Sequence, residues 1–344
     1  MIQHPPSSHV HSPGKGPMRR IGRFTVTDKL GSGSNGNVLL GHDPIIDRAV
    51  AIKILNNPVG ATDKKQREQQ FINEARAAGR LSHPNIVTIY DASTEGGTTF
   101  IAMEFLQGKD LRELMTGGKK FDPIEAAGIG YKVANALAFA HNQGVIHRDI
   151  KPANIFIVEN NQPKVVDFGI ARVPNRVLDE DGQAQTLFKG NIMGTPNYMS
   201  PEQASSQPVT ALTDVYSLGA VMYEMVTGQK PFSASDFDKL LHNINHRTPK
   251  SPELLNPAVP EKLALIIMKA MQKKPHRRYK SAAEMALALN RFLAKEKRAR
   301  RSSNTNNPTS STKAFFSGKG SLFWLGWLSV LIAAALAFLA FTNH

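Results

Sequence analysis

A change of hydrophobic period along the chain limits the fold more than any other feature of the sequence. From Phe24 to about Leu114 the apolar residues fall in short strand-like runs, whereas beyond Asp122 they recur at helical spacing. The predicted strands include residues 23–30, 36–43, 48–55 and 98–105, with a helix at 65–81. The predicted later helices include residues 123–144, 213–228, 260–272 and 281–297. We therefore expect an α+β, bilobal fold, with a small β-rich lobe, a larger helical lobe and a cleft between them.

The composition is that of a globular protein with an excess of positive charge. Of the 344 residues, 41% are hydrophobic and 20% are charged, which does not fit a disordered chain. The chain has no cysteine, so disulfides and thiolate zinc sites are excluded. The formal net charge of +14 fits either nucleic acid or acidic lipid. A basic cluster from Arg291 to Arg301 precedes a long apolar run, which favours membrane lipid or simple solubility, so we expect no nucleic-acid partner.

The two ends of the chain differ from its middle. Residues 1–20 are rich in Pro, Ser, Gly and His without any period, which predicts a disordered tail. Residues 322–341 form an uncharged apolar run, about 30 Å long as a helix, with Trp324 and Trp327 near one end. A buried soluble helix is the alternative, but we predict a transmembrane helix. The basic residues before it place the main domain on the cytoplasmic side of the cell membrane, in a single-pass topology.

These features predict five consecutive segments. They are a tail at 1–20, a main domain at 21–294, a basic and polar linker at 295–321, a transmembrane helix at 322–341 and a short external tail at 342–344.

A glycine-rich loop lies between two of the predicted strands. Residues 31–38 read Gly-Ser-Gly-Ser-Asn-Gly-Asn-Val, and glycines let backbone amides approach phosphate oxygens without obstruction by a Cβ atom. A dinucleotide-binding fingerprint begins in the same way but requires a helix directly after the glycines, whereas a strand follows here. A plain hairpin turn would not need three spaced glycines. The loop therefore predicts a phosphate-binding hairpin.

A lysine inside the next apolar strand requires an acidic partner. Lys53 ends the run Val-Ala-Ile-Lys, and a buried ammonium group is costly unless it is paired. Glu74 shares a helix face with Phe71 and Ala78, which directs it at the sheet, whereas Glu68 is turned away from that face. A lysine extending from an edge strand into solvent is the alternative. We expect a pair between Lys53 and Glu74.

Two further segments concentrate acidic and amide side chains. Residues 147–154 read His-Arg-Asp-Ile-Lys-Pro-Ala-Asn, and residues 167–169 read Asp-Phe-Gly. Two carboxylates and an amide suit Mg²⁺, which prefers oxygen ligands and shares them with phosphates. With the glycine loop, the lysine strand and the Ser-Pro-Glu run at 200–202, this ordered set resembles the eukaryotic-type (Hanks-type) serine/threonine protein kinases.

The resemblance extends from about Arg23 to Leu293. The segments 83–92, 147–157 and 194–204 are most similar to the bacterial membrane-anchored group of these kinases. The resemblance implies the bilobal protein-kinase fold, ATP as phosphate donor, and serine or threonine hydroxyls of proteins as acceptors. Two features depart from the family pattern, namely the polar loop tip formed by Ser34 and Asn35, and Ser200 in place of the usual alanine.

The resemblance also implies the catalytic roles, which it places on Asp149, Lys151 and Asn154. Asp149 accepts the proton of the substrate hydroxyl, and Lys151 steadies the charge of the transferred γ-phosphate. Asn154 and Asp167 hold Mg²⁺, with Mn²⁺ as an alternative ion.

An ATP site follows from the same resemblance. Lys53, paired with Glu74, holds the α- and β-phosphates. Met103 is the gatekeeper, the backbone from Glu104 to Leu106 is the hinge that binds adenine, and Asp110 bonds the ribose. The implied ATP-binding residues are Leu30, Gly31, Ser32, Gly33, Ser34, Asn35, Gly36, Val38, Ala51, Lys53, Glu74, Met103, Glu104, Leu106, Asp110 and Phe156.

The remaining implied residues support or regulate the site. Asp214 braces the catalytic loop, and Glu202 pairs with Arg278, although a surface pair is the alternative. Thr186, which follows an acidic stretch, is the candidate phosphosite, recognised by Arg148 after autophosphorylation between neighbouring molecules. A constitutively ordered loop is the alternative. The implied structural residues are Arg148, Phe168, Gly169, Thr195, Glu202, Asp214 and Arg278.

Two other functions compete with a protein kinase. A catalytically weak pseudokinase scaffold at the membrane is disfavoured because Lys53, Glu74, Asp149, Asn154 and Asp167 are all present. A small-molecule phosphotransferase is disfavoured by the long segment from Asp167 to Glu202, which in protein kinases presents the peptide substrate.

Overall fold

The structure is a computed structural model that describes residues 20–33, 36–56, 64–168, 176–178, 184–186 and 196–305. The chain divides into two compact units, Met1–Glu296 and Lys297–His344, and the site discussed below belongs to the first. The predicted membrane helix at 322–341, residues 1–19 of the predicted tail, and Ser34, Asn35, Gly169 and Thr195 lie outside the described residues. Among the helices that are described, none is long and apolar enough to cross a membrane.

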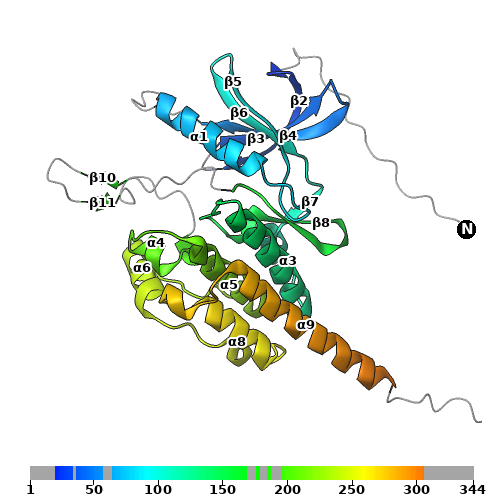
Figure 1. Cartoon of the computed structure of the whole chain (residues 1–344), viewed down its shortest axis with the longest axis vertical. Helices are drawn as coiled ribbons and strands as arrows, with labels where there is room; N and C mark the ends of the chain where they lie inside the picture. Colours follow the sequence, from blue (N-terminus) through cyan, green and yellow to red (C-terminus); the bar gives the residue numbers. More distant parts are fainter. Residues whose placement is uncertain are drawn as a thin grey trace, which may run out of the picture. The chain divides into compact units, whose positions relative to one another are not determined.

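The small lobe is built on an antiparallel sheet with one helix. The strand order is β1-β2-β3-β4-β6-β5. The strands are β1 (Arg20–Ile21), β2 (Phe24–Gly33), β3 (Gly36–Asp43), β4 (Arg48–Leu55), β5 (Ile89–Glu95) and β6 (Thr98–Glu104). Helix α1 (Lys64–Gly79) packs on β5 and β6 (Figure 1).

The alternation of side chains along β4 separates the core from the site. Val50 and Ile52 point to the face where they pack with Phe100 and other apolar residues. Ala51 and Lys53 point to the opposite face, where their register partners on β6 are Met103 and Ile101. Because α1 covers that second face through Phe71 and Ala75, the sheet presents Lys53 toward the helix and the large lobe.

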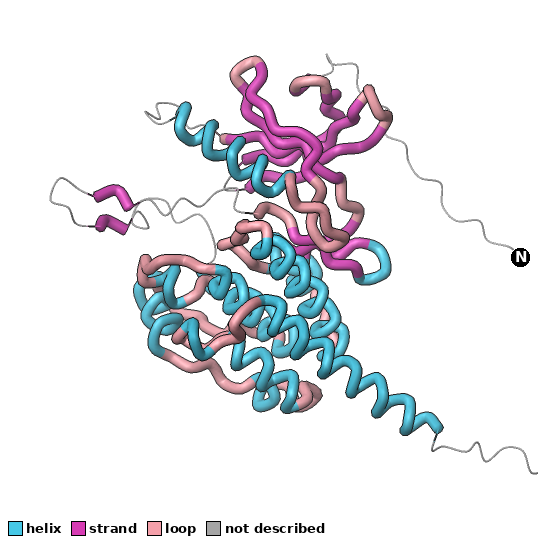
Figure 2. The backbone as a smooth tube through the Cα atoms, in the orientation of Figure 1, coloured by secondary structure: helices cyan, strands magenta, loops and turns pink. Residues whose placement is uncertain are grey.

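The large lobe is mainly helical, as Figure 2 shows. Helices α3 and α5 form its centre, and almost every side chain of α5 is buried. The helices are α2 (Leu111–Thr116), α3 (Pro123–Asn142), α4 (Pro201–Ala204), α5 (Ala211–Thr227), α6 (Phe237–His246), α7 (Pro252–Leu255), α8 (Glu261–Ala270) and α9 (Ala282–Thr305). The further strands are β7 (Gly108–Asp110), β8 (Ile155–Val158), β9 (Gln162–Val165), β10 (Arg176–Leu178) and β11 (Ala184–Thr186).

The segment after α1 joins the small lobe to the sheet β7-β8-β9. Asn85 Nδ2 donates to Pro163 O at 2.7 Å, and Val165 N donates to Asn85 O at 2.9 Å. Val87 N then donates to Val165 O at 3.0 Å. These bonds fix the small-lobe chain against β9, which leads directly to Asp167.

The predicted bilobal architecture is confirmed, and most predicted elements end within a few residues of the observed ones. One difference concerns the predicted linker, whose residues 295–305 continue α9 as helix. The physical reason is composition, because alanine, lysine, glutamate and arginine in this stretch are strong helix formers. The elements that were not predicted are β1, β5, β7 to β11, α2, α4, α6 and α7. Most of them are too short to show a period.

Candidate active site

The glycine-rich segment forms a hairpin between β2 and β3. Gly31 pairs with Val38 and Gly33 with Gly36 in an antiparallel register, so a strand does follow the glycines. The glycines differ in what surrounds them. A Cβ atom at Gly36, where φ is 139°, would lie 1.8 Å from Ile54 O, whereas one at Gly31 would meet no heavy atom within 4 Å. Gly36 is therefore required by the fold, and Gly31 leaves open space above the sheet.

Four of the predicted ATP-binding residues lie in one apolar cluster. Ala51 and Met103 are buried in it, and Val38 and Leu106 are partly buried against it. The cluster also contains Val87, Ile89 and Val166, to which the sequence analysis assigned no role in binding. Leu30 on β2 is 45% exposed and lies at the edge of the lobe. The cluster provides an apolar surface of the kind that a flat heteroaromatic ring covers.

Lys53 pairs with Asp167 and not with Glu74. Its Nζ lies 2.7 Å from Asp167 Oδ2, and the lysine is only 4% exposed. Burial by itself would raise the pKa of Asp167, but the charge and hydrogen bond of Lys53 hold that pKa below its usual value.

Glu74 takes the predicted position on α1 with a different partner. Gln70 Nε2 donates to Glu74 Oε1 at 2.9 Å, while Oε2 is buried without a hydrogen-bond partner among the described residues. Burial raises the pKa of Glu74, although Gln70 and the charges of Arg148 and Lys53 act in the opposite direction. The predicted pair of Lys53 with Glu74 is therefore not formed in this structure, because the Lys53 ammonium group is paired with the carboxylate of Asp167.

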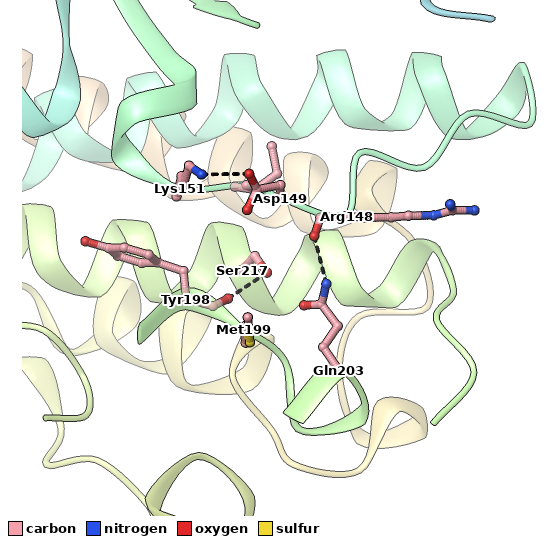
Figure 3. A pocket seen from close by; sticks show the side chains of 8 residues that line it. Arg148, Asp149, Lys151, Tyr198, Met199, Gln203 and Ser217 are labelled. Carbon is pink, nitrogen blue, oxygen red and sulfur yellow. Dashed lines mark hydrogen bonds and ion pairs between the residues drawn. The ribbon is translucent and has the colours of Figure 1, made fainter. Parts of the chain in front are cut away.

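The catalytic loop brings three predicted side chains together. Lys151 Nζ lies 2.7 Å from Asp149 Oδ2 (Figure 3). Asn154 Nδ2 donates to Asp149 O at 2.8 Å and to Asp149 Oδ2 at 3.2 Å. The 3₁₀ turn Pro152–Asn154 produces this arrangement, since it returns the chain after Lys151 toward Asp149. The carboxylate of Asp149 is therefore held between an ammonium group and an amide.

Asp214 on α5 holds the backbone of the same loop. Its side chain is fully buried and accepts from His147 N and Arg148 N at 2.8 Å each. His141 Nε2 lies 2.7 Å from Asp214 Oδ2 and is a third partner that the sequence motifs did not indicate. A buried carboxylate without such donors would be costly, so these contacts explain why an acid is tolerated at the centre of the lobe.

The histidine of the loop connects it to the Asp-Phe-Gly segment. His147 Nδ1 accepts from Asp149 N at 3.2 Å, so Nε2 carries the proton and donates to Val166 O at 2.9 Å. The His147 ring also contacts the Phe168 ring, with centroids 4.7 Å apart. Asp167 has φ of 61°, an uncommon backbone conformation that turns its carboxylate toward Lys53.

The predicted hinge is bound to the large lobe by a charge pair. Lys164 Nζ lies 2.9 Å from both Oε1 and Oε2 of Glu104, and Thr88 N donates to Glu104 Oε2 at 3.2 Å. Lys164 stands on β9, three residues before Asp167. Sequence motifs did not identify Lys164, because its partner Glu104 lies 60 positions earlier in the chain.

Asp110, predicted to bond ribose, is the N-cap of α2 in the structure. Its Oδ1 accepts from Glu113 N at 2.7 Å and its Oδ2 from Arg112 Nη2 at 3.1 Å, and the residue is 4% exposed. Phe156 is its register partner on β8, which places this predicted residue in the sheet β7-β8-β9. The helix cap thus engages Oδ1 of Asp110, and the ion pair with Arg112 engages Oδ2.

Divalent metal fits two of the predicted residues. Within the part of the chain that the structure describes, no group of three or more His, Asp or Glu side chains could hold a metal by itself. Asn154 uses its amide N–H group on Asp149, which leaves its amide oxygen as an acceptor, and Asp167 supplies a carboxylate. One or two oxygen ligands completed by substrate phosphates and water are typical of Mg²⁺ sites, so this donor set fits the ion.

Glu202 and Arg278 form a buried, fully bonded ion pair. Arg278 Nη1 and Nη2 donate to Glu202 Oε1 and Oε2 at 2.7 Å each. Its remaining N–H groups donate to the carbonyl oxygens of Gln272, Leu212 and Lys273, so all five guanidinium donors are used. Burial alone would raise the pKa of Glu202, but the hydrogen bonds and charge of Arg278 hold it below its usual value.

The segment after the Asp-Phe-Gly motif is described only in part. Thr186 is the last residue of β11, and its register partner on β10 is Arg176. Arg148, predicted to receive a phosphate on this segment, has its Nε buried without a hydrogen-bond partner among the described residues. A small pocket beside Asp149 is lined by Arg148, Asp149, Ile150, Lys151, Tyr198, Met199, Gln203 and Ser217 (Figure 3).

Comparison with known proteins agrees with this geometry. The protein kinase domain family model matches residues 24–293. The chain is 40% identical over 278 residues to a probable serine/threonine-protein kinase PknB of Corynebacterium glutamicum, covering 78% of this chain and 42% of that protein. It is 37% identical over 268 residues to the serine/threonine-protein kinase PrkC of Bacillus subtilis, covering 78% and 40%. The chain thus spans about two fifths of the length of these curated relatives.

A solved structure extends the likeness to three dimensions. The kinase domain of PknI from Mycobacterium tuberculosis has a TM-score of 0.63 and 25% identity, covering 81% of this chain and 99% of that domain. The family match covers most of the chain, and the matched curated relatives are named serine/threonine-protein kinases. The chain therefore belongs to the protein kinase family, among its bacterial Hanks-type members.

Proposed function

We propose that the protein transfers the γ-phosphate of ATP to serine or threonine hydroxyls of other proteins. The observation that carries the proposal is the contact set around Asp149. Its carboxylate lies 2.7 Å from Lys151 Nζ and accepts from Asn154, and its backbone is joined through His147 to the residue before Asp167. A base, a cation and a metal-binding amide oxygen are thus grouped on one loop, which His147 joins to the segment that carries Asp167.

The residues divide the chemistry between them. Asp149 accepts the hydroxyl proton and orients that oxygen for in-line attack on the phosphorus atom. Lys151, held beside the carboxylate, opposes the negative charge that spreads over the transferred phosphoryl group. Because Asn154 restrains the Asp149 carboxylate, the base keeps its orientation as the proton arrives.

Nucleotide binding falls to the small lobe and to the segment after β9. The apolar cluster of Ala51, Met103 and Leu106 receives adenine, and the hairpin amides cover the phosphates. The Lys53 ammonium group offsets the negative charge of the α- and β-phosphates. Asn154 and Asp167 would hold Mg²⁺, which neutralises phosphate charge when bound.

A catalytically weak scaffold is the competing function. One observation favours it: Glu74 does not pair with Lys53, whereas kinases of this type pair that glutamate with the strand lysine. The presence of Lys53, Asp149, Asn154 and Asp167 together favours catalysis. In a protein without phosphotransfer, any of these side chains could be replaced by mutation without loss of function.

Phosphotransfer from labelled ATP to a generic basic protein tests the proposal. Asp149→Asn is nearly isosteric and should keep the fold yet remove most transfer, and Lys53→Met should do the same by losing the phosphate contacts. Asp236→Asn is a matched control, because Asp236 caps α6 at the surface. Full activity in both site variants would refute the assignment, and transfer to a small molecule but not to protein would favour the other phosphotransferase class.

We further propose that residues 322–341 anchor this kinase in the cell membrane, with the catalytic domain in the cytoplasm and free to phosphorylate neighbouring copies. The support is the uncharged apolar run preceded by basic residues. Deletion of residues 322–344 should move the protein from the membrane pellet to the soluble fraction with its activity intact. A truncated protein that still sediments after a salt wash would place the anchor elsewhere.

A further inference from the structure

Gln203 lies on the short helix α4 and contacts the catalytic loop. The sequence motifs gave no indication of a contact between α4 and that loop. Helix α4 begins after Ser200, and the two side chains form a capping box, in which Gln203 N donates to Ser200 Oγ at 3.3 Å and Ser200 N donates to Gln203 Oε1 at 3.1 Å. The amide nitrogen of Gln203 is left over from the cap. It donates to Arg148 O at 2.7 Å (Figure 3).

Arg148 has a backbone conformation that needs external support. Its φ is 66°, in the left-handed region that residues other than glycine adopt only where the surroundings hold them. Arg148 N donates to Asp214 Oδ1 at 2.8 Å, and Arg148 O accepts from Gln203. The residue is therefore held at both of its peptide groups, from α5 on one side and from α4 on the other.

The second of these peptide groups carries Asp149. Its oxygen is bound by Gln203, and its N–H is bound by His147 Nδ1 at 3.2 Å. Rotation of this peptide would displace the Asp149 carboxylate relative to Lys151 and Asn154. The Gln203 contact is the shorter of the two restraints, and it alone comes from outside the catalytic loop.

We propose that Gln203 is a positioning residue, which fixes the peptide that carries Asp149 and so couples the docking of α4 to the orientation of the catalytic carboxylate. The inference rests on the proposed phosphotransfer function. The Gln203 side chain is oriented by the backbone of residue 200, because Ser200 N donates to Gln203 Oε1 and the amide nitrogen then faces Arg148 O.

Two variants separate the capping of α4 from the contact with the loop. Gln203→Glu keeps an acceptor for Ser200 N, which a capping box favours, but replaces the donor to Arg148 O by an oxygen. Ser200→Ala removes the cap and leaves the Gln203 amide able to reach Arg148 O. Gln203→Met, of similar length and neutral, controls for the charge of the glutamate.

Hydrogen exchange and steady-state kinetics of the full chain are measured together. In both Gln203 variants, exchange of the amides at residues 148–150 should rise about tenfold and kcat should fall about tenfold, with KM for ATP within about twofold. Ser200→Ala should lower the melting temperature while both exchange in the loop and kcat stay within about twofold of wild type.

The outcomes are distinguishable. If Ser200→Ala and Gln203→Met changed loop exchange and kcat equally, Gln203 would act only as a capping residue, and the inference would be overturned. Unchanged amide exchange at residues 148–150 in both Gln203 variants would also overturn it. Faster exchange with unchanged kcat would also overturn it, since the peptide would then not position the base. A wild-type protein without phosphotransfer would refute the proposed function, while the exchange data would still decide whether Gln203 holds the loop.

Discussion

Removal of Arg278 should destabilise the protein far more than removal of its partner Glu202. Arg278→Met leaves the Glu202 carboxylate buried with the Thr213 hydroxyl, at 2.7 Å, as its remaining side-chain donor. Breaking a buried ion pair in this way costs about 3–5 kcal/mol. Glu202→Gln leaves the guanidinium bonded to three carbonyl oxygens and a neutral amide oxygen, so we expect a cost of about 1–3 kcal/mol.

Urea unfolding followed by far-ultraviolet circular dichroism measures both costs. The double variant should cost less than the sum of the single ones by about 1–3 kcal/mol, because the unpaired carboxylate is no longer left behind. Similar small costs for both single variants, below about 1 kcal/mol, would show that the pair behaves as an exposed one and would refute the reasoning.

The same pair predicts a pH dependence with a definite sign. Because the folded-state pKa of Glu202 lies below its unfolded value, its contribution is present above the unfolded pKa of 4.5 and is lost as pH falls through the folded value. The wild-type free energy of unfolding should therefore decline on acidification more steeply than that of Glu202→Gln. Parallel curves for the two proteins would contradict this origin.

Three further predictions follow from single contacts. Gly36→Ala should lower the melting temperature sharply because its Cβ would overlap a backbone oxygen, whereas Gly31→Ala should melt like wild type; equal melting would contradict the hairpin geometry. Lys164→Met should raise KM for ATP about three- to tenfold with kcat nearly unchanged, since Glu104 in the hinge loses both ammonium contacts, and unchanged KM would exclude this role. Thr186→Ala should lower activity several-fold if phosphorylation of Thr186 activates the kinase, as mass spectrometry of active enzyme would show; unmodified Thr186 in fully active protein would end this account.

Local sequence was sufficient to predict the main elements and the chemistry. The run Val-Ala-Ile-Lys predicted a lysine within an apolar strand, and Lys53 is buried on β4. Helical spacing placed Glu74 on the same face of α1 as Phe71 and Ala78, which are both buried. The segment 147–154 brought Asp149, Lys151 and Asn154 into contact because a tight 3₁₀ turn needs only neighbouring residues.

Partnerships between distant residues could not be predicted in the same way. The prediction that Lys53 pairs with Glu74 was wrong, since the partner depends on how the two lobes bring α1 and the segment after β9 to the sheet. The role of Asp110 was similarly ambiguous, because a carboxylate before a helix serves equally as a cap or as a ligand. Gln203, Lys164 and His141 gave no signal, as each acts on a residue more than fifty positions away.

The sequence by itself determined which groups this protein carries and on which strand, helix or loop each one lies, because periodicity and turn chemistry act over a few residues. Only the tertiary structure decided which buried charges meet. Burial makes an unpaired charge costly, so the buried Lys53 takes the carboxylate of Asp167, and the buried Asp214 takes the backbone donors of the catalytic loop.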